Sequence, residues 1–400
     1  MEWQRQDLGA KPVLSWCALV DGGALKQAAN LANHPAVFRH VALMPDCHVG
    51  YGMPIGGVIA CERALIPNAV GVDIGCGMGA IRTNLAASDL SPELIRRILS
   101  VVKELTPLGE GHAHRLPQKW DGLRERDGDL PGGVDDHGWD LAYRNLGSLG
   151  GGNHFIELQA ADDDLVWLMI HSGSRNLGLR IAEHYHRLAL RVNERGKIEL
   201  PDAELAFLPL ETDEAQDYIR DMTFALAYAR ENRARIMTSF QTAVMDTCPG
   251  VEFDPPIDIH HNYAAEEEHF GRRVWLHRKG ATSARKGEVG IIPGSMGTNS
   301  YIVRGLGNPE AFQSCSHGAG RRMGRMEACR TLDPDACDRA MAGVVFDGWK
   351  PIQKRGGRRG RLLDLEEAPL AYKDIAAVIA AQADLVEPIV RLRPIGVAKG

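Results

Sequence analysis

Four glycine-rich segments, each interleaved with residues that bind metals or phosphates, constrain this chain most strongly. They are GYGMPIGG (50–57), GVDIGCGMG (71–79), LGSLGGGNH (146–154) and IIPGSMG (291–297). Each follows or interrupts a strand-like apolar stretch, where a close backbone approach or a positive φ requires glycine. A flexible linker would contain monotonous Gly and Ser, whereas these segments contain Asp, Cys, His and Asn. The pattern therefore predicts loops that approach a ligand closely.

The segments between these loops predict a mixture of strands and helices. Short apolar or β-branched runs predict strands at 41–44, 57–61, 165–170, 274–277 and 300–303. Ser91 and Pro92 form the N-cap and first position of a helix that continues to 105. Further helices are expected at 215–245 and 372–392, and Pro388 should kink or end the second. Residues 109–138 show no periodicity and predict a long surface loop. The mixture favours an α+β fold.

Composition excludes several classes of protein. A chain of 400 residues with 44% hydrophobic content can bury a large core. Its apolar runs fall far short of the roughly 20 residues that cross a bilayer, and its N-terminus lacks an apolar signal core, so a cytoplasmic protein is expected. The 8 cysteines are scattered and form no CxxC pair, which predicts reduced thiols rather than a disulfide scaffold or a zinc ribbon.

One basic stretch stands out in an acidic chain. The net charge of −6 argues against a protein that coats nucleic acid through global positive charge. Residues 350–361, however, read KPIQKRGGRRGR. A solvated loop and a phosphate-binding loop are both open interpretations of this stretch.

Asp73 and Cys76 lie three residues apart in GVDIGCGMG, on a predicted glycine-rich turn. A carboxylate and a thiolate at one point suit a transition metal, because a coordinating thiol is deprotonated and can bridge two ions. A structural cysteine beside a turn aspartate is the alternative for this motif alone. His154 after three glycines, His171 at the end of an apolar strand and His261 in HHNY favour a binuclear centre, provided that these distant residues converge.

His317 lies between small residues in SCSHGAGR. Small neighbours leave room for a bulky group on the imidazole, and the following Arg321 and Arg322 offer paired donors for phosphate. A nucleophilic histidine and a loop histidine bonded to the backbone are both compatible with this motif. Asp46 and His48, in MPDCHVGYG, suit general-base work or phosphate contact, with a turn-capping aspartate as the alternative.

Taken together, the motifs resemble those of the RtcB family of RNA ligases. PDCHVGYG, GVDIGCGMG, GGGNHFIE, HSGSR, HHNY, RKGATSA, IIPGSMGT, SHGAGR and VAKG occur in the order and approximate spacing of that family over residues 41–400. Any one motif could be accidental, but the ordered set is specific. The resemblance implies a single domain, 1–400, with the family's α+β fold: mixed β-sheets surrounded by helices and a central binuclear metal site. Cys47 departs from the family's usual aliphatic residue, and no ligand role is assigned to it.

The resemblance also implies a reaction. It joins an RNA 3'-phosphate or 2',3'-cyclic phosphate to a 5'-hydroxyl end, in tRNA splicing or RNA repair, with GTP as cosubstrate and two manganese ions. His317 attacks the α-phosphate of GTP, the guanylate passes to the RNA 3'-phosphate, and the 5'-hydroxyl displaces GMP. A cyclic phosphate is first opened by metal-assisted hydrolysis. The physiological RNA, the oligomeric state and the need for an accessory activating protein stay open.

The family's functional positions carry over to motif residues in this chain. The manganese ligands would be Asp73, Cys76, His154, His171 and His261, with Cys76 as the bridge. The guanylate-binding positions would be Asn153, Glu157, Ser295, Ala319, Gly320, Tyr372 and Lys399. The catalytic residues would be His317 and Asp46, and the residues near the RNA end or the triphosphate would be Asp46, Arg175 and Asn262.

Two other functions stay open at this point. A binuclear phosphohydrolase or cyclic phosphodiesterase would use the same metals without covalent catalysis, and labelling by GTP without RNA separates it from a ligase. A non-enzymatic RNA-binding module would rest on the basic stretch and would bind without turnover. A dinucleotide fold is not indicated, since GYGMPIGG is not followed by a clear helix and a later acidic residue. One thiolate with several imidazoles should bind zinc more tightly than manganese, so manganese rests on the resemblance and on metal availability.

Overall fold

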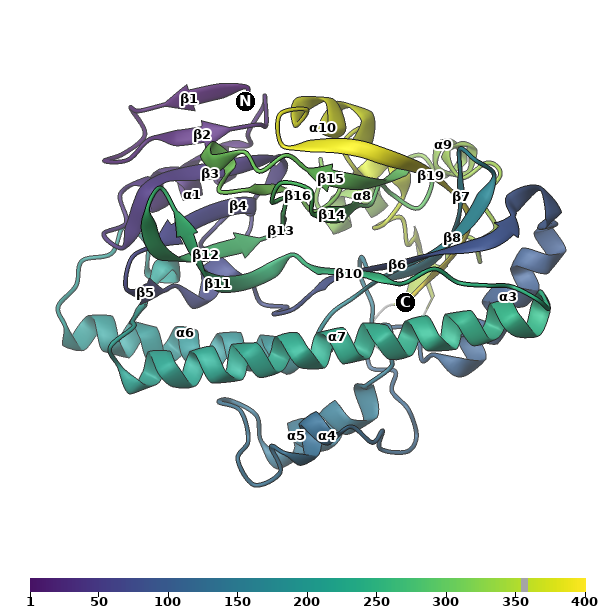
Figure 1. Ribbon diagram of the computed structural model, residues 1–400, viewed down its shortest axis with the longest axis horizontal. Helices are drawn as coiled ribbons and strands as arrows, with labels where there is room; N and C mark the ends of the chain where they lie inside the picture. Colours follow the sequence, from purple (N-terminus) through teal and green to yellow (C-terminus); the bar gives the residue numbers. More distant parts are fainter. Residues whose placement is uncertain (354–358) are drawn as a thin grey trace.

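Two β-sheets and a layer of helices make up most of the structure, a computed structural model that describes residues 1–353 and 359–400 (Figure 1). The first sheet has the strand order β1-β2-β3-β4-β12-β11, and the second has the order β10-β6-β8-β7-β19-β15-β14. The described strands pair in antiparallel fashion, apart from the parallel pair of β2 and β3. This combination of sheets and helices confirms the predicted α+β class.

The strands have the following bounds. The first sheet contains β1 (Trp3–Arg5), β2 (Val13–Ser15), β3 (Val37–His48), β4 (Ile55–Cys61), β11 (Asn262–His269) and β12 (Arg272–Lys279). The second contains β6 (Gly77–Ala86), β7 (Phe155–Ala161), β8 (Leu165–Ser172), β10 (Ile257–His260), β14 (Val289–Ile292), β15 (Ser300–Gly305) and β19 (Val386–Lys399). Short pairs join β5 (Ala64–Leu65) to β9 (Leu208–Pro209), β13 (Ala281–Ser283) to β16 (Ser314–Ser316), and β17 (Pro351–Gln353) to β18 (Arg359–Leu363). All five predicted strands are confirmed, within β3, β4, β8, β12 and β15.

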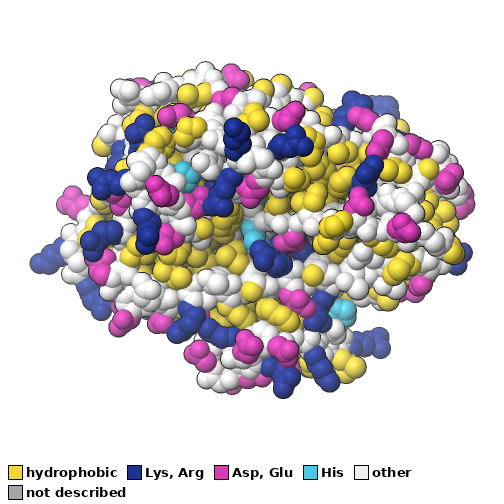
Figure 2. Space-filling view, viewed as in Figure 1, with side chains coloured by type: hydrophobic (Ala, Val, Ile, Leu, Met, Phe, Trp, Pro, Cys, Tyr) yellow, Lys and Arg dark blue, Asp and Glu magenta, His cyan; other side chains and the backbone are white. Residues whose placement is uncertain are grey.

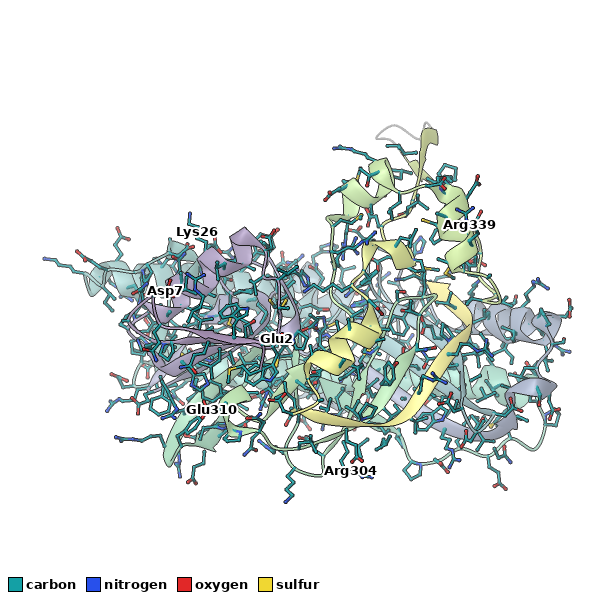
Figure 3. The ribbon with its side chains drawn as sticks, turned by 90° about the horizontal axis from the view of Figure 1, so that it is seen from above. Glu2, Asp7, Lys26, Arg304, Glu310 and Arg339 are labelled. Atoms are coloured by element: carbon teal, nitrogen blue, oxygen red, sulfur yellow. The ribbon has the colours of Figure 1, made fainter. Side chains whose placement is uncertain are left out.

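Some of the helices pack along the sheets, whereas others lie in a part of the chain that projects from them. They are α1 (Gly22–Ala32), α2 (Pro67–Val70), α3 (Pro92–Leu105), α4 (Asp121–Arg124), α5 (Asp136–Asn145), α6 (Leu177–Arg195), α7 (Asp213–Thr247), α8 (Arg325–Thr331), α9 (Pro334–Ala340) and α10 (Ile375–Ala381). The long helix α7 runs beside α6 below both sheets, with α4 and α5 on its outer side (Figure 1). The part that contains α8 and α9, marked by Arg339, projects from the sheets (Figure 3).

Two predicted helices are confirmed, and a side-chain hydroxyl caps each of them. The Ser91 hydroxyl accepts a hydrogen bond from the Leu94 amide (3.3 Å), and Pro92 occupies the first position of α3. The Thr212 hydroxyl caps α7 in the same way, accepting from the Ala215 amide (3.3 Å). Each helix buries one stripe of side chains, and α3 contacts both α7 and β19.

The predicted helix at 372–392 is wrong. Only Ile375–Ala381 is helical, and the chain then forms β19, which lies between β7 and β15. The alanine-rich beginning has high helix propensity, whereas the VEPIVRLRPIGV stretch contains β-branched residues that suit a strand. Its prolines are tolerated because Pro388 and Pro394 lie at irregularities in the pairing with β15 and β7. Tertiary pairing therefore overrides the local helical pattern.

The segment 109–138 is mostly loop, as predicted, and contains the short helix α4. It is anchored to α7, because the Asp221 carboxylate accepts hydrogen bonds from the Arg126 guanidinium (2.8 Å) and the Gly132 amide (2.7 Å). Leu123 and Val134 are buried in the core cluster that contains residues of α6 and α7. The loop is therefore a packed part of the fold.

Three other sequence predictions can be compared with the structure. All eight cysteines are free, which confirms the predicted reduced thiols. In the part of the chain that the structure describes, no helix is both long and apolar enough to span a membrane. Part of the basic stretch, residues 354–358, lies outside the residues that the structure describes.

Candidate functional site

The predicted metal ligands lie where neighbouring strands of the second sheet begin and end. Cys76 immediately precedes β6, His154 immediately precedes β7, His171 is near the end of β8, and His261 follows β10. Because β10, β6, β8 and β7 are antiparallel neighbours, the end of one strand meets the start of the next. The pairing register aligns His171 with both Met78 and Phe155. Sheet pairing therefore brings these distant residues together.

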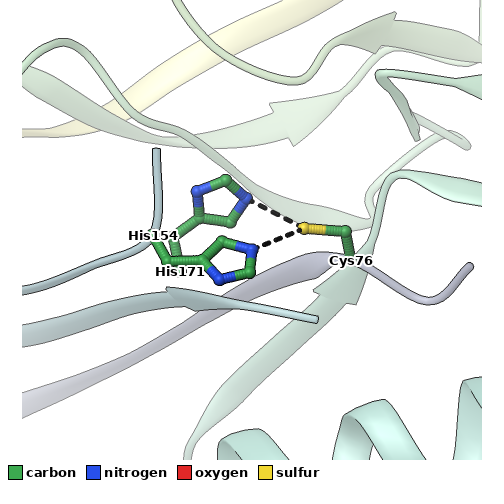
Figure 4. A group of neighbouring side chains, drawn as sticks. All are labelled: Cys76, His154 and His171. Atoms are coloured by element: carbon green, nitrogen blue, oxygen red, sulfur yellow. Dashed lines mark hydrogen bonds between the residues drawn. The ribbon is translucent and has the colours of Figure 1, made fainter. Parts of the chain in front are cut away.

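The ligand atoms of these side chains face one another, as Figure 4 shows for Cys76, His154 and His171. Cys76 Sγ lies 3.5 Å from His154 Nε2 and 3.2 Å from His171 Nε2. His171 Nε2 lies 3.4 Å from His261 Nε2, and Asp73 Oδ2 lies 3.5 Å from His154 Nε2. The three atoms from Cys76, His154 and His171 all lie within 4.8 Å of one another. One thiol, three imidazoles and one carboxylate thus surround a common volume.

Backbone carbonyls orient two of the imidazoles. His154 Nδ1 lies 2.9 Å from the Leu149 carbonyl, and His171 Nδ1 lies 3.1 Å from the Asn153 carbonyl. A neutral imidazole that donates from Nδ1 has its lone pair on Nε2, which is the atom that faces Cys76 in both cases. The Asp73 carboxylate is held similarly, since its Oδ1 accepts from the Ser174 amide (3.0 Å) and hydroxyl (2.7 Å).

The protonation states suit a metal site. Burial holds the pKa of His171 and of His261 well below the usual histidine range, so both imidazoles are neutral. Burial would raise the pKa of Asp73, but its bonds to His154 and Ser174 outweigh burial and lower that pKa. Burial raises the pKa of the Cys76 thiol, and a bound cation is the group that would reverse this. The two neutral imidazoles, an ionised carboxylate and a buried thiol that a bound cation would ionise fit a transition metal.

A buried arginine lies behind the cluster and was missed by sequence analysis. Arg233 of α7 is 1% exposed, and its guanidinium forms a two-pronged pair with Asp258 (2.7 and 2.8 Å). It also donates to the carbonyls of Gly75 (2.8 Å) and Ser172 (3.2 Å), and its Nη2 lies 3.2 Å from His260 Nδ1. These partners adjoin Cys76, His171 and His261, so one side chain connects three ligand-bearing segments. The available sequence signal was a charged side chain on the mostly apolar buried stripe of α7, which also contains Asp221 and Asn232.

His317 is positioned next to the cluster by Asp46. The Asp46 carboxylate is fully buried and accepts hydrogen bonds from the amides of His317 and Gly318, both at 3.2 Å. Its Oδ2 also lies 2.6 Å from His317 Nδ1, although these two atoms are not aligned as a hydrogen bond. The His317 ring centroid is 4.9 Å from that of His261. With Nδ1 next to Asp46, Nε2 is the His317 nitrogen left for a reaction partner.

Two glycines make these close approaches possible. A Cβ on Gly320, whose φ is +73°, would overlap the Asp46 backbone carbonyl, and a Cβ on Gly173 would overlap the Asp73 carboxylate. Each glycine therefore lets the backbone reach a residue of the site.

A cavity of about 910 Å³ opens beside His317, and every residue that sequence analysis assigned to guanylate binding lines it. Those lining residues are Asn153, Glu157, Ser295, Ala319, Gly320, Tyr372 and Lys399. His48, His171 and His317 also line the cavity, as do Arg321, Arg322 and Arg325. On the face shown in Figure 2, positive and negative side chains are interspersed around a central hollow.

A largely buried carboxylate, which sequence analysis also missed, lies in one wall of this cavity: Glu367, whose side chain is 10% exposed. Glu367 bonds to the Tyr372 hydroxyl, to Lys399 Nζ (3.0 Å) and to Arg321 Nη1 (3.2 Å). Burial would raise the pKa of Glu367, but these partners outweigh it and lower the pKa to about 2. Glu157, by contrast, has a pKa raised to about 7, because burial outweighs its bond from Gln159 (2.7 Å) and the charge of Lys399.

Arg175 and Asn262, which sequence analysis assigned to the RNA end or the triphosphate, lie beside the metal-ligand cluster. Arg175 has a positive φ of 52°, and its Nε donates to the Ser148 hydroxyl (3.1 Å). Asn262 connects two backbone segments, since its Nδ2 donates to the Asp73 carbonyl (3.1 Å) and its Oδ1 accepts from the Gly280 amide (2.8 Å). Neither residue lines the cavity next to His317.

Comparison with known proteins gives a consistent match over nearly the whole chain. The family described as "tRNA-splicing ligase RtcB" matches residues 27–400. Among similar proteins, the "RNA-splicing ligase RtcB" of Escherichia coli (strain K12) is 40% identical, with 97% of each chain covered. The "tRNA-splicing ligase RtcB" of Pyrobaculum aerophilum is 33% identical, covering 94% of this chain and 91% of its own. The "RNA-splicing ligase RtcB" of Mycobacterium tuberculosis is 34% identical, covering 94% and 100%. The chain therefore belongs to the RtcB family.

Proposed function

We propose that this chain is an RNA ligase that uses GTP and His317 to seal RNA 3'-phosphate or 2',3'-cyclic phosphate ends to 5'-hydroxyl ends. The observation that carries the proposal is the position of His317, which lies between the buried Asp46 carboxylate and the metal-ligand cluster and lines the large cavity. Family membership supports the same reaction, because the similar proteins are named as RNA-splicing or tRNA-splicing ligases.

The proposed nucleophile is His317 Nε2. Its attack on the α-phosphate of GTP forms an N–P bond and releases pyrophosphate. Asp46, whose Oδ2 lies 2.6 Å from Nδ1, stabilises the positive charge that develops on the ring, a role that buried carboxylates perform for catalytic imidazoles. An oxygen of the RNA 3'-phosphate then takes the guanylate and breaks the N–P bond. Finally, the RNA 5'-hydroxyl attacks the activated phosphate, and GMP leaves.

Asp73, Cys76, His154, His171 and His261 are the residues that would hold metal, and we propose two Mn²⁺ ions. Metal bound there would supply positive charge to the phosphates. The cluster and the family support metal dependence, and the donor set by itself favours zinc, so the choice of manganese follows the family resemblance. Ser295, Tyr372 and Lys399, with Glu157, Asn153, Ala319 and Gly320, are proposed to bind the guanylate in the cavity.

The test uses two substrates that enter the reaction at different steps. Wild-type protein incubated with Mn²⁺ and radioactive GTP should become labelled without RNA and should then seal RNA. His317→Ala should lose labelling and sealing of a 3'-phosphate end, yet should still seal RNA whose 3' end already carries guanylate. Cys76→Ala should fail on both substrates, because metal serves the first and last steps alike.

The same experiment identifies a wrong assignment. Uptake of labelled guanylate by His317→Ala would remove the nucleophile from this residue. A wild type that hydrolyses cyclic phosphate ends but is never labelled by GTP would instead be a binuclear phosphohydrolase.

A further inference from the structure

An exposed aromatic residue lies on the loop that connects β3 and β4. Tyr51 is 68% exposed and its neighbour Val49 is 48% exposed. Isolated exposed apolar side chains are common and need no explanation. These two, however, both line the cavity that contains His317. An aromatic ring is therefore available to a molecule that reaches this nucleophile.

The backbone beneath the ring is fixed on several sides. Gln27 bonds to both the carbonyl (2.5 Å) and the amide (3.2 Å) of Gly50. The buried Lys279 ammonium group donates to the carbonyls of Tyr51 and Asn68, which attaches the loop to α2. Gly52 has a φ of +66° and sits so close to Glu204 that a Cβ would lie 2.9 Å from the Glu204 carbonyl oxygen. The ring is thus exposed to solvent on a loop whose main chain is held in place.

The chemistry of the loop suits a base rather than a phosphate. Residues 49–54 read VGYGMP and contain no lysine or arginine, whereas Arg322 and Arg325 elsewhere in the cavity lining can contact phosphates. No residue that was assigned to guanylate binding lies on this loop. Single-stranded RNA ends expose unstacked bases, and aromatic side chains bind such bases by stacking with little sequence preference.

We propose that Tyr51 stacks on an unpaired base of a terminal nucleotide of the RNA being sealed. This inference rests on the proposed ligase function. Tyr51 would act in RNA binding, while formation of the His317 guanylate would not require it. The nucleotide can belong to the 3'-phosphate end or to the 5'-hydroxyl end, since both ends must approach the same cavity.

The first experiment compares Tyr51→Ala, Tyr51→Phe and the control Leu116→Ala, which truncates another exposed side chain (75%) that does not line the cavity. Sealing is measured against RNA concentration, and labelling by GTP is measured without RNA. Tyr51→Ala should raise the KM for RNA by about 5- to 100-fold, the effect of losing one base–aromatic stack. Tyr51→Phe and Leu116→Ala should keep the wild-type KM, and all three should be labelled like wild type.

The second experiment identifies the RNA end. Substrates with an abasic residue at the 3'-phosphate end or at the 5'-hydroxyl end are sealed by wild type and by Tyr51→Ala. Removing the stacked base should raise the KM of wild type but should add little to that of Tyr51→Ala, because each change removes the same stacking interaction. Only the end that stacks on Tyr51 should show this departure from additivity.

Two results would overturn the inference while the ligase proposal stands. The first is an unchanged KM for RNA in Tyr51→Ala; the second is a raised KM for GTP in labelling, which would assign the ring to the nucleotide. Wild-type protein that neither takes up guanylate nor seals RNA would contradict the proposed function itself.

Discussion

Glu157 has an acid–base property that a guanylate site can use. Burial raises the pKa of its carboxyl to about 7, so this group changes charge near neutral pH. Its position in the cavity lining is one of those that resemble guanylate-binding residues. An ionised carboxylate accepts hydrogen bonds from the N–H groups of a guanine edge, whereas a protonated carboxyl accepts them poorly.

We therefore expect GTP to bind more tightly as pH rises through about 7. The ionised fraction of Glu157 should make GTP bind about tenfold more tightly at about pH 8 than at about pH 6. Equilibrium binding to His317→Ala protein measures this without turnover. Glu157→Gln is the control, since it keeps the shape of the side chain and should show only the weak pH dependence of the triphosphate itself. Equal pH dependence in both proteins would exclude Glu157 from guanine recognition.

Among the elements, α7 connects the fold to the metal-ligand cluster through Arg233. Replacement by methionine removes the hydrogen bonds of the guanidinium and leaves the half-buried Asp258 carboxylate without its two-pronged partner. Breaking a fully buried pair costs about 3–5 kcal/mol, and because the Asp258 side chain is 26% exposed we expect a smaller loss of stability here, about 1–3 kcal/mol. Because the partners adjoin Cys76, His171 and His261, affinity for Mn²⁺ should also fall by about 10- to 100-fold.

A matched control lies one turn away on the same helix. Arg230 has a 67% exposed side chain and approaches the same Asp258 at 3.8 Å. Arg230→Met should change the free energy of unfolding by less than about 1 kcal/mol and leave Mn²⁺ affinity unaltered. Urea unfolding and titration calorimetry measure the two quantities. Equal metal affinity in Arg233→Met and wild type would reduce Arg233 to a purely structural residue.

The strand β19 carries Lys399 to the wall of the cavity, where its ammonium group pairs with Glu367. Lys399→Met should raise the KM for GTP in the labelling reaction at least about tenfold, since it removes a proposed guanylate contact and the positive charge that pairs with the Glu367 carboxylate. Arg391→Met is the control on the same strand, because Arg391 and its exposed partner Asp162 do not line the cavity. Unchanged labelling by Lys399→Met at limiting GTP would remove Lys399 from the nucleotide site.

At the scale of the whole molecule, a net charge of −6 requires any strong attraction for RNA to be local. The basic stretch at 350–361 is the candidate from the sequence. Neutralising Arg355, Arg358 and Arg359 should weaken RNA binding and flatten its salt dependence, by about 0.7–0.9 in logarithmic slope for each phosphate that no longer pairs with an arginine. Fluorescence anisotropy across a salt series measures the slope. An unaltered slope would assign the stretch to a solvated loop.

Short motifs in the sequence predicted candidate site residues, whereas residues and strands whose roles depend on distant partners were missed. Motifs such as GVDIGCGMG and SHGAGR identified ligand and nucleophile candidates because small residues and reactive side chains alternate within a few positions. Glu367 and Arg233 were missed because their roles depend on partners far away in the chain. The strand β19 was read as a helix because pairing with β7 and β15 outweighs local propensity. Burial, which sets the pKa of Glu157, is likewise a property of the assembled sheets.

The dispersion of the site along the chain has a consequence for biosynthesis. Roughly 240 residues separate Cys76 from His317, and at about 5–20 residues per second a ribosome needs tens of seconds to add them. Until His154, His171 and His261 have been added, the thiol of the nascent chain lacks the imidazoles that later surround it. Metal capture by the finished cluster must follow the late pairing of β10 with β6. Oxidants or competing soft metals in the cell would therefore react with the Cys76 thiol of the nascent chain far more readily than with that of the folded enzyme.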